Sequence, residues 1–411
     1  MQTATRHDEA QPERNPLLRA LLTLPALWVG TLLAVLSTTV GLRNALYRSQ
    51  DFQWSPERLI ARHIDPWAVY LSGDAQHRIL LTQIPNYLHE LYVLLLPIGW
   101  LSFAQAKIIW ALCSLALLVL SCACIARLYE LPPRQTWLLI VLFFLGTPAR
   151  VVLGNGQSTA LVLATLALWA VAASACARGL LLGLGYAKYS VAPPLALFLL
   201  LRRRWKLLAY SALPPLAGLG FVFLWLRTTP LCDLVWEPFR AATNGNVSPG
   251  LANIMAVAEI VLHRLPLFHS APDAAYMAPR AHWMDLTPYL CAVALAVALA
   301  AYFFARGAEV DGRVLLACLA ATCLLCFKHQ VYDFLLLAFA LALALRSPCG
   351  RPRNFLLLGI GYFWFVERLM HIRRWEFWPA VVLASFVLLL AMIAAAWRLR
   401  ASIHWRQRWE L

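Results

Sequence analysis

Long apolar runs, separated by short segments that carry Arg and Lys, constrain this chain more than any other feature of its sequence. Four of them cover about 17–40, 106–126, 206–227 and 377–398, and each matches the roughly 20 residues that an α-helix needs to cross a bilayer. Hydrophobic residues make up 61% of the 411 residues and charged residues only 13%, which is more apolar surface than a soluble domain can bury. The sequence therefore predicts an all-α, polytopic transmembrane helical bundle.

We expect about twelve membrane spans. Besides these four runs, we place spans at 134–149, 157–176, 178–188, 190–201, 286–306, 313–327, 331–345 and 354–369. Two of these, between 178 and 201, are short and are interrupted by Gly183, Gly185, Lys188, Pro193 and Pro194. Irregular backbone at membrane depth is tolerated only where protein covers it or where it lines a cavity. We therefore expect a cavity near Lys188.

The basic residues indicate which loops are cytoplasmic. The net charge is +15, but Lys and Arg lie in short clusters between apolar runs, which is the topology signal of a membrane protein and not a nucleic-acid footprint. With a cytoplasmic N-terminus, the cytoplasmic loops carry Arg127, Arg178, Arg202–Lys206, Arg306 and Arg346. The C-terminus is then cytoplasmic too, and the polar residues collect on the outer face.

Two apolar stretches are too short for a crossing and lie in the predicted outer loops. These are Leu88–Phe103 and Leu251–Leu262, which we expect to form interfacial helices. The chain then forms one integral-membrane domain over 1–411. Its core covers 1–227 and includes a long outer loop at 41–105; an outer loop at 228–285 and C-terminal helices at 286–411 follow.

Asp51 is the candidate catalytic residue. It lies just past the first span, and an ionisable group so close to hydrocarbon is a functional-site candidate by default. A solvated aspartate in an ordinary loop explains the position equally well. The other polar residues that the predicted topology delivers to the same face favour a functional role.

Three further groups could serve such a site. Arg150 precedes Gly154-Asn155-Gly156-Gln157, where Asn155 and Gln157 could bind hydroxyls across a backbone that approaches a ligand closely; a plain Gly-rich turn between helices is the alternative. Lys188 could meet a phosphate, or its side chain could extend along the span toward the interface. In the same way, Asn246 and Ser248 lie in a stretch that is either functional or a plain loop.

Lys328 and His329 follow one predicted span, and Asp333 follows His329 by four residues. That spacing places His329 and Asp333 on one face of a helix, as a structural or a catalytic pair. The cysteine pairs Cys122/Cys124 and Cys323/Cys326 have metal-like spacing but no second cluster of ligands, so we expect neither a metal nor a cofactor.

Several weak motifs together resemble the GT-C membrane glycosyltransferases, and family 87 in particular. The matching segments are Asp51-Phe52, Asp65-Pro66-Trp67-Ala68-Val69-Tyr70, Pro85–Pro97, Gly154–Gln157, Gly183…Lys188…Pro193, Arg202–Trp205, Asn246–Ser248 and His329. The family's best-known member is a polyprenyl-phosphate-mannose-dependent mannosyltransferase.

The resemblance implies a GT-C type fold in the bacterial plasma membrane. It also implies transfer of a sugar, mannose as the first choice, from a polyprenyl monophosphate donor to a lipid or glycan acceptor on the periplasmic or outer face. We expect Asp51 to be the general base, and Lys188, His329, Lys328 and Arg150 to bind the donor phosphate. Asn155, Gln157, Asp65, Asn246 and Ser248 would contact sugar or acceptor. A transporter or flippase of lipid-linked sugars is the alternative.

Overall fold

The computed structural model is a bundle of helices and contains no β-strand among the residues it describes, which are 16–191, 193–227, 229–244, 252–264, 282–307, 309–366, 378–403, 405 and 409. The helices of its first half are α1 (Pro16–Leu21), α2 (Leu24–Tyr47), α3 (Trp54–Ala61), α4 (Pro66–Leu71), α5 (His89–Gly99), α6 (Phe103–Leu128), α7 (Pro133–Leu145), α8 (Thr147–Asn155), α9 (Thr159–Val171), α10 (Ala175–Gly185), α11 (Pro193–Leu201) and α12 (Trp205–Leu226). Those of the second half are α13 (Leu231–Asn244), α14 (Ile254–Arg264), α15 (His282–Arg306), α16 (Gly312–Cys326), η2 (Val331–Leu337), α17 (Ala338–Arg346), α18 (Arg351–Gly361), η3 (Tyr362–Val366), α20 (Trp378–Arg398) and η5 (Leu399–Ala401). The predicted all-α class is confirmed.

Five helices are long and apolar enough to cross a membrane, namely Leu24–Tyr47, Phe103–Leu128, Trp205–Leu226, Thr287–Arg306 and Pro379–Ala401. The bent pair α7 and α8 would add a sixth crossing. Apolar helices of 10–17 residues occur as well, α9, α10 and α16 among them. The chain is thus a multi-pass, all-helical membrane protein, while the expected number of about twelve spans stays a prediction.

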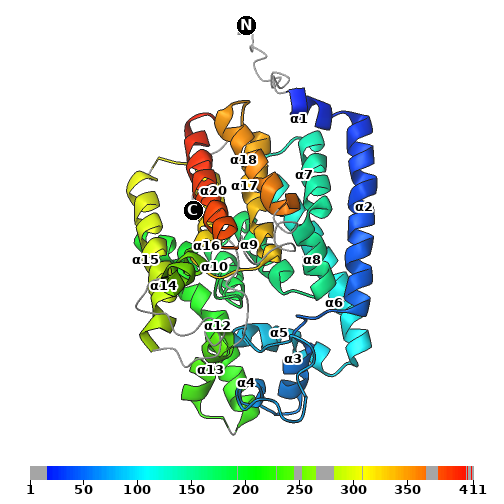
Figure 1. Cartoon of the computed structure of the whole chain (residues 1–411), viewed down its shortest axis with the longest axis vertical. Coiled ribbons are helices and arrows are strands. Elements are labelled where there is room, and N and C mark those ends of the chain that lie inside the picture. Colours follow the sequence, from blue (N-terminus) through cyan, green and yellow to red (C-terminus); the bar gives the residue numbers. More distant parts are fainter. Residues whose placement is uncertain are drawn as a thin grey trace.

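α2 shows how such a helix meets lipid. Its buried side chains are those of Leu27, Ala34, Ser37 and Ala45, on the face that packs against α7 and α8. Leucine, valine and tryptophan side chains elsewhere on the helix are exposed, as at Leu32, where 61% of the surface is uncovered. Such an apolar surface is unfavourable in water but is compatible with the hydrocarbon core of a bilayer. In Figure 1, α2 forms one edge of the bundle and α15 the opposite edge.

The segment after α7 differs from the prediction. We expected a span at 134–149 followed by a loop over 150–157, but α8 continues the helix to Asn155 after a bend of 56°. Gly146 adopts an extended conformation at the bend, and Pro148 lies in the first turn of α8, where its missing N–H costs nothing. Asn155 and Arg150 are therefore helical residues.

The predicted break between 178 and 201 is confirmed, but it covers fewer residues than we expected. α10 ends at Gly185 and α11 begins at Pro193, so Lys188 lies in the irregular segment between them. Gly183 is not part of the break. A Cβ atom there would lie 2.4 Å from the Ser211 carbonyl oxygen, so this glycine lets α10 pack closely on α12.

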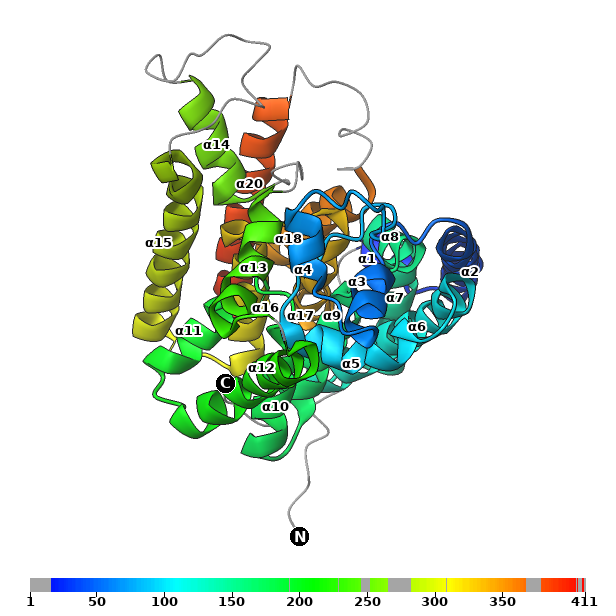
Figure 2. The ribbon, with the colours of Figure 1, turned by 90° about the horizontal axis from the view of Figure 1, so that it is seen from below.

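Both short apolar stretches form helices, as predicted. α5 and α14 have 11 residues each, or about 16 Å of rise, against a hydrocarbon core of about 30 Å. α5 packs on α3 and α12, and α13 packs on α4, so these five helices form a layer at one end of the bundle, whereas α14 packs on α15 and α20 (Figure 1). Seen from that end, α2 and α15 again lie on opposite sides (Figure 2).

The loops predicted to be cytoplasmic do meet in the structure. Arg313 forms an ion pair with Glu130 at 2.9 Å and donates to the Leu128 carbonyl oxygen at 2.6 Å. The Trp409 amide donates to Asp311 at 3.0 Å. We call this part of the molecule the arginine-rich end, after Arg178, Arg202, Arg306, Arg313, Arg346 and Arg400. α16 leads from Arg313 at this end to Lys328 and His329 at the other.

Candidate active site

Asp51 lies in a short turn between α2 and α3, and its backbone is tied to the end of α8. Its amide donates to the Asn155 carbonyl oxygen at 3.1 Å. The Thr82 hydroxyl donates to Oδ1 at 2.5 Å, and Asn155 Nδ2 donates to Oδ2 at 3.4 Å. Each carboxylate oxygen keeps further lone-pair capacity. The carboxylate is therefore oriented but still able to accept a proton.

Phe52 anchors this turn in the core. Its ring stacks on Trp110 at 5.8 Å, and Trp110 Nε1 donates to the Gly156 carbonyl oxygen at 2.8 Å. Gly156 has φ +70°, and a Cβ atom there would lie 2.7 Å from the Phe52 Cβ atom. The glycine that we expected to admit a ligand thus admits Phe52, and it fixes the position of Asp51.

A buried ion pair lies near Gln157. Lys188 Nζ pairs with Asp333 Oδ1, and their side chains are 11% and 1% exposed. The Thr159 hydroxyl donates to the same carboxylate oxygen at 2.8 Å, and Lys188 Nζ lies 3.0 Å from that hydroxyl. The Gln330 amide donates to Oδ2 at 3.0 Å, and Lys188 lies 4.6 Å from the centre of the Tyr332 ring.

The expected pairing of His329 with Asp333 is wrong. Residues 327–330 are not helical, because Phe327 and Gln330 are extended and η2 begins only at Val331. The i, i+4 geometry of one helix face therefore does not apply. Asp333 instead caps the start of η2 and pairs with Lys188, which lies 145 residues earlier in the sequence.

A cavity of about 90 Å³ lies beside the ion pair of Lys188 and Asp333. Its wall includes Tyr87, Lys188, Lys328, His329 and Asp333. Tyr87 also donates to Gln157 Oε1 at 3.1 Å, which brings Gln157 to the same region. The structure thus brings together six of the predicted site residues, Asp51, Asn155, Gln157, Lys188, Lys328 and His329, at what we call the Asp51 end of the bundle.

His329 is the buried titratable group of this cavity. Its Nδ1 lies 2.9 Å from the Phe327 carbonyl oxygen, which can only accept, so Nδ1 carries the proton. Among the described residues, its buried Nε2 has no hydrogen-bond partner. Burial lowers the pKa of His329, and the nearby Asp333 opposes that shift. The neutral ring therefore presents an acceptor at Nε2, which becomes a donor when the ring is protonated.

Other predicted site residues lie elsewhere. Asp65 caps α4, where its Oδ1 accepts the amides of Trp67 and Ala68 at 2.9 and 3.0 Å and its Oδ2 accepts the Thr229 hydroxyl at 2.7 Å. Arg150 donates to the Thr147 hydroxyl at 3.4 Å. Asn246 and Ser248 lie outside the described residues.

Several residues of the site were not among the predicted ones. Thr82 and Tyr87 come from the long loop before α5, and Thr159 begins α9 two residues after Gln157. No local pattern marks a threonine as the partner of a carboxylate 174 residues away. Tyr87 closely follows Pro85 and Thr159 closely follows Gly154-Asn155-Gly156, whereas Thr82 follows no glycine- or proline-rich segment.

Carboxyl groups outside the cavity also have shifted pKa values, Glu57 in the long first loop and Glu237 on α13 among them. Burial raises the pKa of Glu57, whose carboxylate oxygens have no partner among the described residues. On α13, burial and then repulsion from Asp65 and Asp233 raise the pKa of Glu237 to about 7. Neither group lines the cavity beside Lys188.

Comparison with known proteins gives one family. The sequence model of glycosyltransferase family 87 matches residues 91–328, which is more than half of the chain and includes Asn155, Gln157, Lys188 and Lys328. No curated protein matches the sequence. The chain belongs to glycosyltransferase family 87.

Proposed function

We propose that this glycosyltransferase moves a hexose, mannose as the first choice, from a polyprenyl monophosphate to a hydroxyl of a lipid or glycan acceptor. The transfer would occur on the outer face of the bacterial plasma membrane, opposite the arginine-rich end. The observation that carries the proposal is the carboxylate of Asp51, which Thr82 and Asn155 orient at the same end of the bundle as Lys188, Lys328 and His329. Family membership supplies the reaction class.

Asp51 would act as the general base. As the acceptor oxygen forms its bond to the anomeric carbon, the hydroxyl proton passes to the Asp51 carboxylate. The bond between the anomeric carbon and the phosphate oxygen breaks, and its electron pair leaves with the polyprenyl phosphate. A single displacement inverts the anomeric configuration. Such a base typically contributes about 10²–10⁴-fold to the rate.

The cationic side chains of the cavity would bind the donor phosphate. Because Asp333 neutralises Lys188, that lysine would serve as a hydrogen-bond donor with little net charge. Positive charge would then come from Lys328 and from His329 in its protonated form. Arg150, whose guanidinium contacts Thr147 on α8, would act at longer range.

The acceptor and the sugar hydroxyls would contact the side-chain amides of Asn155 and Gln157, away from the cations that bind the phosphate. Asn155 holds Asp51 and Gln157 binds Tyr87, so both amides already face this region. The prenyl chain would lie in the bilayer beside α5 and α14. Asn246 and Ser248 would contact the acceptor, and Asp65, which caps α4, would shape the layer of short helices at this end.

Transfer of radiolabelled sugar in membranes tests the proposal. The Asp51→Asn variant should lose at least about 100-fold in rate while keeping its expression level. Asp233→Asn, which removes an exposed carboxylate from α13, is the matched control and should keep wild-type transfer. Wild-type transfer by Asp51→Asn would eliminate Asp51 as the base. Movement of labelled lipid across liposomes without a glycosidic product would instead identify a transporter.

A further inference from the structure

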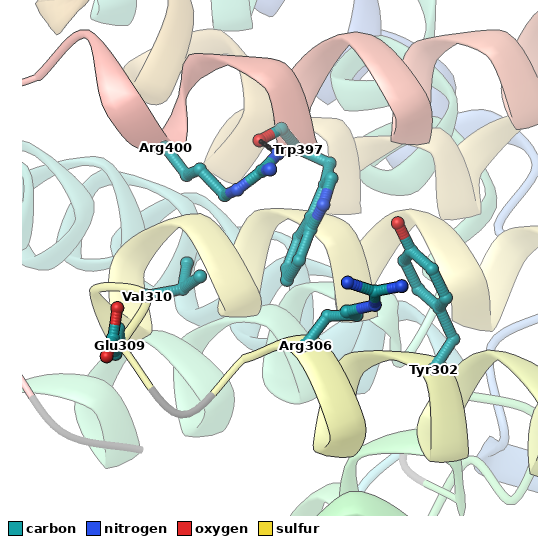
Figure 3. Close-up of a pocket in the computed structure, with 6 residues that line it drawn as sticks. All are labelled: Tyr302, Arg306, Glu309, Val310, Trp397 and Arg400. Carbon is teal, nitrogen blue, oxygen red and sulfur yellow. Dashed lines mark hydrogen bonds between the residues drawn. The ribbon is translucent and has the colours of Figure 1, made fainter.

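A second and larger cavity, of about 450 Å³, lies at the arginine-rich end. Tyr302 and Arg306 of α15 line it together with Trp397 of α20, and Glu309, Val310 and Arg400 complete its wall. Figure 3 shows the Trp397 ring directed from α20 toward α15, where Arg306 and Tyr302 lie, with Glu309 on the opposite side of the cavity from Tyr302. The volume falls in the range of pockets that hold small ligands, about 300–1,000 Å³.

This cavity is separate from the Asp51 end. α11 connects the two regions, because Lys188 lies shortly before its first residue and Arg202 directly follows its last. Its nine residues span about 13 Å. The Arg202 guanidinium lies 5.7 Å from the centre of the Phe304 ring, next to Tyr302 and Arg306 on α15. A ligand here would not contact the proposed catalytic groups.

The cavity carries a net positive charge. Within the described part of the chain, Arg306 makes no hydrogen bond or ion pair, although its side chain borders the cavity. Arg400 donates to the Trp397 carbonyl oxygen at 3.0 Å and lies 4.9 Å from the centre of the Trp397 ring. No ion pair among the described residues joins Glu309 to either arginine. Two guanidinium groups and one carboxylate leave a single positive charge.

The remaining wall is suited to the boundary between water and lipid. The ring centres of Trp397 and Tyr302 are 5.6 Å apart, and 47% of the Tyr302 surface is exposed. Tryptophan and tyrosine prefer this depth, because one part of the ring system is apolar and the other is polar. Val297 and Phe304 of the same helix are also exposed, on a surface that acyl chains would cover.

We propose that this cavity binds the phosphodiester of an anionic phospholipid from the adjacent leaflet. Arg306 and Arg400 form charge-assisted hydrogen bonds with the phosphate oxygens, and the single negative charge of the phosphodiester balances the net charge of the cavity. The acyl chains lie against the exposed apolar side chains of α15. Basic pockets between transmembrane helices are suited to such head groups.

Native mass spectrometry of the full-length protein in detergent, titrated with phosphatidylglycerol, tests the site. The double variant R306Q/R400Q should bind phosphatidylglycerol at least about tenfold more weakly than the wild type. The control R127Q/R351Q removes the same charge from two exposed arginines that do not line the cavity, and should change binding less than about twofold. Glu309→Gln raises the net charge and should tighten binding, a gain that misfolding cannot produce.

Phosphatidylcholine and inorganic phosphate complete the experiment. The wild type should bind phosphatidylcholine more weakly than phosphatidylglycerol. The R306Q/R400Q variant should bind the two lipids with equal affinity. An excess of inorganic phosphate should leave bound phosphatidylglycerol in place; if it displaces the lipid, the site holds a soluble phosphate and the lipid proposal is wrong. Unchanged binding by R306Q/R400Q, or equal losses in both double variants, overturns the proposal as well.

Discussion

Lys188 and Asp333 form a buried ion pair that joins the irregular segment before α11 to the start of η2. Thr159 and Gln330 donate two further hydrogen bonds to the carboxylate at 2.8 and 3.0 Å. Removing one member of such a pair leaves an uncompensated charge, which costs about 3–5 kcal/mol, whereas apolar replacement of both can be nearly neutral.

Lys188→Met and Asp333→Leu should therefore each lower the thermal midpoint of the purified protein more than the double variant does. The measurement is a thermal unfolding series in one detergent. Thr165→Val, a buried hydroxyl of α9 that bonds only within its own helix, is the control for a generic core change. A double variant less stable than both single variants would show that the ion pair does not govern this region.

Gly156→Ala should reduce both stability and sugar transfer. The new Cβ atom would lie 2.7 Å from the Phe52 Cβ atom, in a backbone conformation with φ +70° that itself costs about 1–3 kcal/mol for a non-glycine residue. Displacing Phe52 moves Asp51, so we expect kcat to fall at least about tenfold.

Gly220→Ala is the matched control, because nothing lies within 4 Å of the added atom. This change in the interior of α12 should leave transfer unchanged and raise stability slightly. If both alanine variants behave alike, contact with Phe52 does not position Asp51.

The affinity for the donor should increase as the pH falls, through His329. Burial lowers its pKa, so the free protein holds a neutral ring near neutral pH. A donor phosphate beside Nε2 favours the protonated ring, and donor binding then takes up a proton. KM for the donor should be lower at pH 6 than at pH 8 in the wild type, and this difference should vanish in His329→Gln.

The measurement is the pH dependence of KM and kcat taken separately. A loss of kcat alone, with the KM profile intact in His329→Gln, would contradict the role of this residue in phosphate binding.

Glu237 should make the protein less stable as the pH rises. Its pKa in the folded protein, about 7, lies above the ordinary value of 4.5, mainly because of burial and then because of Asp65 and Asp233. Folding therefore disfavours the charged form. The stability contributed at low pH is lost as the pH rises from about 4.5 to about 7.

Glu237→Gln should consequently have a higher thermal midpoint than the wild type at pH 8 and the same midpoint at pH 4.5. Glu309→Gln removes a carboxylate from an exposed loop at the other end and is the control for a generic loss of negative charge. Equal midpoints of Glu237→Gln and the wild type across this range would contradict the assignment.

The helices were predictable because their signals are local. Runs of apolar residues predicted α2, α6, α12, α15 and α20, and the lysine and proline residues between 188 and 194 marked the break before α11. Asp65 carried a local signal as well. An aspartate directly before a proline is typical of a helix N-cap, and the structure shows that capping role.

The partners within the site were not predictable in this way. Lys188 and Asp333 are 145 residues apart, and each looks like an isolated charge within its own segment. Gly156 looked like a point of contact with a ligand because glycine permits any close approach. Only the packed helices reveal that the approaching group is Phe52.

The bend between α7 and α8 connects the last third of the chain to the candidate active site. A Cβ atom on Gly146 would lie 3.1 Å from the Trp364 ring, and Trp364 Nε1 donates to the Phe334 carbonyl oxygen at 2.9 Å, one residue after Asp333. One indole thus braces the helix that carries Asn155 and the turn that carries the partner of Lys188. A chain shortened to the segment that matches family 87 would lose this brace, so the candidate active site depends on residues beyond the segment by which the family is identified.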